Sequence, residues 1–568
     1  MKRIQKATVA ALLSLATIGT PIASADDYTT MLIDPNVVFD TVSYTAGPVT
    51  TNPGGQPGAA KVYSHQPSRQ NQPGPQPSAP VQPAQLSAMM IGTGVTGFGG
   101  ELVLLSTEAA CAPCAPSSAP AAIPADAIVM ASFLIGDLPS IRPPTRMRTL
   151  RPRWCDRDTM WIMTSVRFAA ADAQLLWLSA KVPNDQFLVY VFDGKLDIPS
   201  ALAEVRRNAQ ECADLRLRVC DDTFWRYPRW VSGDVGDEQF VVHANVGEWR
   251  DCLPVLAGLD QLDTRRMAWR VNVFPPNTVV VQIVHALADG GRSAALAATM
   301  FGRRVTLHTV RPDSGNLLWR AARAARAHRR LVRDTEAGLL PPPMPPRPAL
   351  SVNARSSATP VLRTLVVDRR QLDGPTVTVA ALSAIAETLG GYLAGRGEDV
   401  SQLCAEVPMA GRGNQARNDF RNVTIGLHPE LGRAQRTAAI SADIDAARRR
   451  AEHPAALASA EAFATVPAPL LRWGIGHFDA NARSATVNGH TVVSSVNRGP
   501  ADLTFGGRPV VLTAGFPALS PVMGLTHGVH GIGDRVALSV HADPGVIDVD
   551  DYLARLHAHT AVWQGKCE

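Results

Sequence analysis

Short apolar runs alternate with helix-like segments along roughly the last 400 residues of this 568-residue chain. Runs of four to six residues bounded by turn formers predict strands, and longer segments with helical periodicity predict helices. The predicted strands are Phe187–Phe192, Val279–Val284, Leu362–Val367, Val423–Leu427, Val492–Val496, Pro509–Leu512 and Val536–His541. The predicted helices are Ser200–Leu215, Ser293–Met300, Leu317–Leu339, Val379–Ala394, Ile440–Arg450 and Val549–Trp563. This mixed alternation favours an α/β (α+β) fold built from two sandwiches.

Composition divides the chain further. The first 25 residues have a basic start, an apolar middle and the small-residue site Ala23-Ser24-Ala25, which predicts a secretory signal peptide. Residues 26–162 are rich in Pro, Gly and Ala and lack periodicity, so a largely irregular region is expected there. Five prolines within Pro341–Pro346 predict a stiff crossover. The remaining boundaries are 163–340 for an N-terminal subdomain, 341–361 for the Pro-rich crossover and 362–568 for a C-terminal subdomain.

Charge excludes one class of partner. A net charge of +5 is small for this length, and no basic stripe is interleaved with stacking aromatics, so nucleic-acid binding is not expected. Arginines concentrate in the predicted helix Leu317–Leu339, which fits either contact with anionic lipid headgroups or a solvated helix between subdomains. After the signal peptide no run reaches the ~20 apolar residues of a membrane helix, so no integral membrane segment is expected.

The cysteines conflict with the signal peptide. Cys111 and Cys114 have Cys-x-x-Cys spacing in a Pro- and Ala-rich tract, where a local disulfide or an unpaired solvated pair is favoured over a zinc or redox site. The other six show no framework and are typical of the packed, reduced thiols of an intracellular enzyme: Cys155, Cys212, Cys220, Cys252, Cys404 and Cys567. We therefore hypothesise that a secreted-type leader is joined to a complete enzyme that begins near Met163.

The most specific chemical pattern is His-x-x-x-Asp-Gly over His285–Gly290, at the end of a predicted apolar strand. A strand end holds an imidazole rigidly, and the near-neutral pKa of histidine suits it to take a proton from a hydroxyl. Asp289 would orient the loop or the ring, and Gly290 would allow a backbone conformation that a side chain forbids. By itself, the motif also fits a structural histidine that is hydrogen-bonded in the core.

Several segments between about Met163 and Trp563 occur in the order found in the bacterial wax ester synthase/diacylglycerol acyltransferase family, which the chain resembles. They are Ala170–Leu178, Phe187–Gly194, Leu262–Trp269, His285–Gly290, Ser494–Pro500 and Phe516–Pro521. The family's active-site signature is His-His-x-x-x-Asp-Gly, and its second histidine, the general base, matches His285.

The chain departs from the family pattern at four places. Val284 replaces the first histidine of the signature, and an Asn-Asp pair expected at the start of a helix is absent near Thr376–Thr378. Arg270 stands where the family has an acidic residue, and Arg498 interrupts the Asn-Val-Pro-Gly-Pro element.

The resemblance implies two chloramphenicol-acetyltransferase-like sandwich subdomains with an active-site tunnel between them. It also implies an O-acyltransferase that moves a long-chain acyl group from acyl-CoA to diacylglycerol or a long-chain alcohol, giving triacylglycerol or wax esters. His285 would take the acceptor's proton and pass it to the departing thiolate. Asp289 would be structural, either paired with an Arg or hydrogen-bonded within its turn. Asn497 would donate to the oxyanion or cap a turn.

No cofactor and no metal are expected, because acyl-CoA enters as a substrate. The acyltransferase region would be cytoplasmic or peripheral to a membrane or lipid droplet, whereas the signal peptide indicates export. Two other functions stay open, namely a lipid-binding protein without catalysis and a condensation-type acyltransferase that uses a carrier-protein thioester. Other patterns are weaker: His527, His530 and Asp534 more often indicate sheet packing than a metal site.

Overall fold

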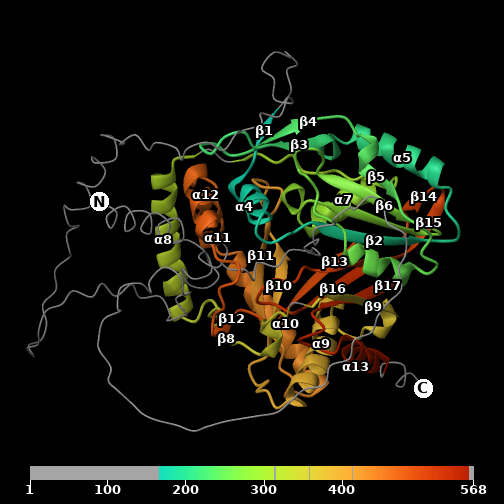
Figure 1. Cartoon of the computed structure of the whole chain (residues 1–568). Helices are drawn as coiled ribbons and strands as arrows, with labels where there is room; N and C mark the ends of the chain where they lie inside the picture. Colours follow the sequence, from blue (N-terminus) through green and yellow to red (C-terminus); the bar gives the residue numbers. More distant parts are fainter. Residues whose placement is uncertain (1–164, 313–314, 357, 412, 562–568) are drawn as a thin grey trace, which may run out of the picture. The chain divides into compact units, whose positions relative to one another are not determined.

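The computed structural model describes residues 165–561 except 313–314, 357 and 412. Two six-stranded mixed sheets form its centre, with helices packed against them (Figure 1). The predicted α/β (α+β) class with two layered subdomains is confirmed. The predicted signal peptide, the irregular region and four cysteines lie outside the described residues: Cys111, Cys114, Cys155 and Cys567.

The first sheet has the order β14-β15-β2-β7-β6-β5. Its strands are β2 (Gln186–Phe192), β5 (Phe240–Val242), β6 (Trp269–Phe274), β7 (Thr278–Ile283), β14 (Thr504–Phe505) and β15 (Arg508–Gly515). All residues of β2 and β7 are buried. Alternate residues of β2 enter two cores, with Tyr190 in the first and Val189 in the second. Burial of both faces explains why these strands appear as continuous apolar runs in the sequence.

The second sheet has the order β11-β10-β13-β16-β17-β9. Its strands are β9 (Val361–Asp368), β10 (Cys404–Ala410), β11 (Phe420–Gly426), β13 (Thr491–Asn497), β16 (Leu525–Ile532) and β17 (Arg535–Ala542). The central strands β10, β13 and β16 are parallel, and the outer pairs are antiparallel. Three short strands form a separate small sheet, and two more form a pair: β1 (Val166–Arg167), β3 (Leu217–Cys220) and β4 (Arg229–Ser232), then β8 (Arg347–Pro348) and β12 (Thr486–Val487).

A hairpin from the C-terminal half completes the first sheet. Strand β15 pairs antiparallel with β2, so residues 504–515 belong to the first sheet although they follow the crossover by about 150 residues. The same strand also packs across β16 and β17 of the second sheet. A shared apolar core that includes Phe187, Leu362 and Phe516 lies between the two sheets. The crossover predicted at 341–361 thus divides the sequence into two halves, but the first sheet contains strands from both halves.

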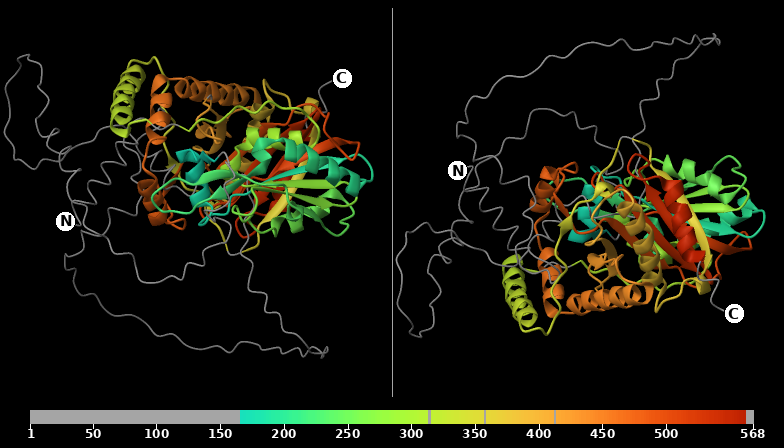
Figure 2. Two further views of the ribbon diagram at one scale, coloured as in Figure 1. Left: turned by 90° about the horizontal axis from the view of Figure 1, so that it is seen from above. Right: turned by 90° about the horizontal axis from the view of Figure 1, so that it is seen from below.

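Several helices cover the outer faces of the sheets, and others pack to one side of them or between them (Figures 1 and 2). Their bounds are α4 (Ala170–Leu178), α5 (Ile198–Glu211), α6 (Leu253–Ala257), α7 (Gly290–Met300), α8 (Leu317–Glu336), α9 (Val377–Ala394), α10 (Arg433–Ala451), α11 (Pro454–Phe463), α12 (Ala468–His477) and α13 (Val549–Ala561). Helices α5 and α7 pack together beside the first sheet, and α9, α10 and α13 pack beside the second. Helix α8 packs against α11.

Helix α9 alone among the described helices has the length and apolar composition of a membrane span. Within its most apolar window, 72% of the residues are buried in the structure, where they contribute to the core of the second subdomain. We therefore interpret α9 as a core helix. The four described cysteines are unbonded: Cys212, Cys220, Cys252 and Cys404.

Candidate active site

His285 follows the buried strand β7 and begins a single 3-10 turn that leads toward α7. Its side chain is only 4% exposed. Burial lowers the pKa of His285 to about 4, and the hydrogen bonds of its own turn and of Asn418 counteract only part of this effect. The imidazole is therefore neutral at physiological pH, as a general base must be.

Asn418 orients the His285 ring. The Nδ1 atom of His285 lies 2.9 Å from Oδ1 of Asn418. The Nδ2 group of Asn418 donates to Oδ1 of Asp172 at 3.0 Å and to the backbone carbonyl of His285 at 2.9 Å. Because Nδ2 faces acceptors, the amide oxygen must face His285, and Nδ1 must carry the proton. The neutral ring then has its lone pair on Nε2, which becomes the basic nitrogen.

Asp172 holds the segment that carries Asn418. It lies in the first turn of α4, and its carboxylate accepts from the backbone amides of Arg417 and Asn418 at 2.9–3.1 Å as well as from the Asn418 side chain. Burial raises the pKa of Asp172 to about 6 against the opposing effect of these donors. Asp172 thus fixes Asn418, and Asn418 fixes His285, through contacts that join the beginning of the described chain to its second half.

Asp289 caps α7 and ties it to the same segment. Its Oδ1 accepts from the backbone amide of Arg292 at 2.8 Å, and its Oδ2 accepts from the amide of Asp419 at 3.2 Å. Burial raises its pKa, while these amides and the charge of Arg292 counteract the rise. Of the two interpretations offered by the sequence, the observed contacts correspond to hydrogen bonding within the turn.

Gly290 has a different role from the predicted one. It is the first residue of α7 and does not have a positive φ, so the expectation of a backbone conformation forbidden to other residues is wrong. A helical φ is open to any residue at this position. Gly290 is among the residues that line a small cleft.

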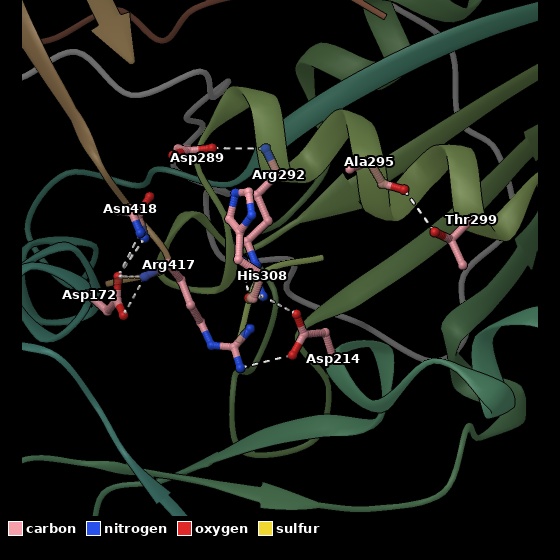
Figure 3. Close-up of polar contacts among 9 residues, drawn as sticks. All are labelled: Asp172, Asp214, Asp289, Arg292, Ala295, Thr299, His308, Arg417 and Asn418. Carbon is pink, nitrogen blue, oxygen red and sulfur yellow. Dashed lines mark hydrogen bonds and ion pairs between the residues drawn. The ribbon is translucent and has the colours of Figure 1, made fainter. Parts of the chain in front are cut away.

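A buried ion network stabilises the loop around Asn418 (Figure 3). Asp214 binds Arg417 at 2.9 Å through one carboxylate oxygen and Arg292 through the other. Burial would raise the pKa of Asp214, but the hydrogen bonds and charges of the two guanidinium groups hold it below the usual range. Because all three side chains are mostly buried, this network connects the start of α7 to the segment before β11 more firmly than a surface pair would.

Asn497 lies at the end of β13, and its side chain is exposed. Its Oδ1 accepts from the backbone amide of Gly499 at 3.0 Å, which is the turn-capping arrangement that the sequence left open. Among the described contacts, none joins Asn497 to His285 or Asn418. Its assignment as an oxyanion donor stays a prediction.

A small cleft lies beside the His285 turn, between elements of both sheets. It encloses about 230 Å³ including the open solvent at its mouth, and it is lined by Gln186, Phe187, Leu188, Gly290, Val496, Arg498, Gly515, Phe516 and His530. The Nε2 group of Gln186 donates to the carbonyl of Ala288, within the motif, at 2.5 Å. The cleft therefore meets the loop that carries His285, whereas a continuous tunnel to the ring stays a prediction.

The candidate metal residues do not converge. His527 contacts Thr491 through Nδ1 at 2.9 Å and Tyr552 through Nε2 at 2.8 Å. His530 follows three residues later on the same strand and therefore points to the opposite face. Within the described residues, no group of three or more His, Cys, Asp or Glu side chains is arranged to hold a metal ion.

No motif in the sequence marks Asn418 as part of the site, and Asp172 is indicated only by its place in Ala170–Leu178, a segment that resembles the family. The only signal for Asn418 was its place in Arg417-Asn418-Asp419, a polar triplet directly before a strand. The family pattern predicts an Asn-Asp pair near Thr376–Thr378, where the structure shows Thr376 as the N-cap of α9. Asn418 and Asp419 lie on another segment and contact the His285 motif directly.

Residues 417–559 match the family model described as the WS/DGAT C-terminal domain. The comparison with curated proteins gives no match. Among solved structures, the wax ester synthase/diacylglycerol acyltransferase from Marinobacter aquaeolei VT8 has 17% identity and a TM-score of 0.47, and the match covers 70% of this chain and 99% of that one.

Condensation domains are also similar in structure. A mutant starter condensation domain of rhizomide synthetase in complex with C8-CoA and Leu-SNAC has 14% identity and a TM-score of 0.46, covering 71% of this chain and 94% of its own. The first condensation domain of the calcium-dependent antibiotic synthetase, in complex with a substrate analogue, has 15% identity and a TM-score of 0.45, with 70% and 95% covered.

Proposed function

We propose that this chain, whose residues 417–559 match the WS/DGAT C-terminal domain, is an acyl-CoA-dependent acyltransferase. Its acceptor would be an alcohol, either diacylglycerol or a long-chain alcohol, and its product triacylglycerol or a wax ester. The observation that carries the proposal is the buried, neutral His285 whose protonation is set by Asn418.

In the proposed reaction, Nε2 of His285 takes the proton of the acceptor hydroxyl while its oxygen attacks the thioester carbonyl. The tetrahedral intermediate then collapses, the carbon–sulfur bond breaks, and the coenzyme A thiolate receives the proton from His285. Because burial lowers the pKa of His285, its protonated form gives up the proton more readily than a solvent-exposed imidazolium. The Nδ1–H group donates a hydrogen bond to Oδ1 of Asn418 in both protonation states of the ring, so the ring keeps its orientation during the reaction.

The test uses the full-length chain with palmitoyl-CoA and either hexadecanol or dipalmitoylglycerol. We expect release of free thiol together with an equal amount of ester, measured by a thiol reagent and by mass spectrometry. His285→Ala should abolish both products, whereas His477→Ala, an exposed control at the end of α12, should retain them. Ester formation unchanged in folded His285→Ala would refute the mechanism.

The condensation-type alternative differs in the donor, because it takes the acyl group from a carrier-protein thioester. The same assay with a palmitoyl carrier protein in place of palmitoyl-CoA distinguishes the two donors. Saturable binding of palmitoyl-CoA without any ester from any donor, indifferent to His285→Ala, would instead support the lipid-binding interpretation.

We also propose that α8 contacts a lipid surface that presents the substrates. Leu318 and Trp319 at its start are 61% and 62% exposed, and exposed arginines follow along the helix: Arg323, Arg326, Arg329, Arg330 and Arg333. Part of this charge is neutralised within the protein, because Arg320 and Arg323 both pair with Glu461 of α11. Exposed Trp and Arg together suit an anionic interface. Sedimentation with phosphatidylglycerol vesicles should fall in Trp319→Ala, and binding unchanged by this substitution would contradict the proposal.

A further inference from the structure

The turn that carries His285 lies beyond the hydrogen-bond ladder of the first sheet. Strand β7 ends at Ile283, which is the last of its residues that pairs with β2. Two backbone hydrogen bonds close the turn from within: the amide of Leu287 donates to the carbonyl of Val284 at 2.9 Å, and the amide of Ala288 donates to the carbonyl of His285 at 3.1 Å. The position of the turn relative to the sheet therefore depends on further contacts.

Asn418 holds the first part of the turn from the second half of the chain. Its Nδ2 group donates to the backbone carbonyl of His285 at 2.9 Å and to that of Ala286 at 3.4 Å. The described contacts include no bond from Asn418 to the carbonyl of Ala288 at the other end of the turn. A different group must hold that end.

Gln186 holds the last part of the turn. Its Nε2 group donates to the carbonyl of Ala288 at 2.5 Å, and the Ser293 hydroxyl approaches the same oxygen at 3.4 Å. Because a carbonyl oxygen can only accept, the amide nitrogen of Gln186 must face it. Among the described residues, no backbone amide donates to this carbonyl. Gln186 and Ala288 are 1% and 0% exposed, so water does not readily replace the donor.

The side chain of Gln186 extends from a rigid base. Gln186 is the first residue of β2, and its backbone lies opposite Ile283 in the antiparallel pair. The preceding residue, Asp185, accepts from the amide of Leu262 at 2.7 Å and from the side chain of Gln282 at 2.8 Å. These contacts fix the start of β2, so the amide of Gln186 can hold the turn at a constant position relative to the sheet.

The turn is thus held at both ends by side-chain amides from different parts of the chain. Without Gln186, the buried carbonyl of Ala288 would keep only the longer contact with Ser293. The turn could then shift against the end of β7, and His285 would shift with it. General-base catalysis is sensitive to such a shift, since a misplacement of about 1 Å can lower the rate by about 100-fold.

We propose that Gln186 is a positioning residue for acyl transfer. By holding the carbonyl of Ala288, it keeps Nε2 of His285 at the distance from the acceptor hydroxyl that proton transfer requires. The inference rests on the proposed acyl transfer at His285, and it requires no contact between Gln186 and the acyl chain or the acceptor. A side chain that only filled space would be replaceable by an apolar one of the same length.

Gln186→Met tests this distinction, because methionine has a similar length and no donor. In full-length protein assayed with palmitoyl-CoA and hexadecanol, we expect kcat to fall by about 10- to 100-fold and KM to stay nearly unchanged. Gln239→Met is the matched control. Gln239 is also buried and donates to a backbone carbonyl at 3.2 Å, but that carbonyl belongs to Trp269 of β6. The control should keep the kcat of the wild type, and a folded Gln186→Met with wild-type kcat would overturn the proposal.

Gln186→Glu adds a test whose sign depends on the donor. A protonated carboxyl group can donate to the carbonyl of Ala288, whereas a carboxylate cannot. Burial raises the pKa of a carboxyl group, so the ratio of variant to wild-type kcat should rise by about tenfold between about pH 8 and pH 5. His285 stays neutral over this range. Gln239→Glu should show no such rise, and a ratio for Gln186→Glu that is independent of pH would contradict the role of the donor.

Hydrogen exchange separates this proposal from the proposed function, because it requires no turnover. In mass spectrometry of the peptide that covers residues 284–290, the bonded amides of Leu287 and Ala288 should exchange about 2- to 10-fold faster in Gln186→Met, as loss of one hydrogen bond allows. Gln239→Met should leave this exchange unchanged. Faster exchange in a chain that forms no ester would support the positioning of the turn and refute the proposed function. Unchanged exchange and unchanged kcat in a chain that forms ester would do the opposite.

Discussion

Replacing Asn418 by alanine tests whether the amide sets the protonation of His285. The substitution removes the acceptor 2.9 Å from Nδ1 of His285 and the donor to the carbonyl of the same residue. Asp172 loses one donor but keeps the backbone amides of residues 417 and 418. Loss of the buried hydrogen bond between Nδ1 of His285 and Asn418 should cost about 0.5–1.5 kcal/mol of unfolding free energy. A positioned general base contributes a factor of about 10²–10⁴ to the rate. The kcat of Asn418→Ala should therefore be lower than that of the wild type by a factor in this range.

The assay measures ester formation from palmitoyl-CoA and hexadecanol beside urea unfolding of the same preparations. Asn422→Ala is the matched control, because Asn422 lies on β11 and donates to Glu406 at 3.1 Å, away from His285. We expect this control to lose stability but to keep kcat. Asn418→Asp should retain more activity than Asn418→Ala, since a carboxyl oxygen still accepts from Nδ1 and the buried pair with Asp172 can share a proton. A folded Asn418→Ala with wild-type kcat would refute the role assigned to the amide.

Three further predictions concern pH and stability. The acidic limb of the pH profile of kcat/KM should have its midpoint near pH 4 rather than near 6.5, because burial keeps His285 neutral down to about pH 4. A midpoint at pH 6.5 would contradict the buried position of the ring. The pKa of Asp172 is raised to about 6, so the protonated carboxyl stabilises the fold below pH 4, and this stabilisation is lost as the pH rises through 6. The unfolding free energy of Asp172→Asn minus that of the wild type should therefore increase between pH 4 and 7. A difference that stays constant over this range would contradict the raised pKa. Asp289→Ala should lower the unfolding free energy by about 1 kcal/mol or more through loss of the α7 cap, a fall that Asp289→Asn should largely avoid.

The regular elements of the fold were predictable because their apolar periodicity is local. The predicted bounds Val279–Val284 and Val379–Ala394 agree with β7 and α9 to within two residues, because burial of both faces of an element produces a continuous apolar run. The prediction is less accurate for α10, which begins at Arg433 instead of the predicted Ile440, because its first turns are polar and mostly not buried. The pairing of β15 with β2 was not predictable in the same way. Residues 504–515 have the pattern of any buried strand, and which sheet they join depends on contacts about 320 residues apart.

Contacts between residues far apart in the sequence also limit what can be predicted about single residues of the site. His285 was recognisable because a spaced motif follows a strand, whereas Asn418 has no motif and acts only through its position next to the ring. Loop residues acquire such roles from tertiary contacts: Gly411 donates its amide to the carbonyl of Asp419 at 2.6 Å and thereby helps to place the polar triplet. Nothing in the local sequence around Gly411 indicates that the segment lies beside His285.

The candidate base is thus supplied by one half of the chain and oriented by the other. His285 follows β7 of the first sheet, whereas Arg417 and Asn418 precede β11 of the second. The buried ion pairs of Asp214 with Arg417 and Arg292 connect the two segments. If the halves separated, His285 would lose the acceptor that fixes its tautomer, and Asp172 would lose the amide donors of Arg417 and Asn418. Productive geometry at Nε2 therefore requires the docked arrangement of both sheets, and weakening the bridge at Asp214 should reduce acyl transfer even though this carboxylate does not contact the imidazole.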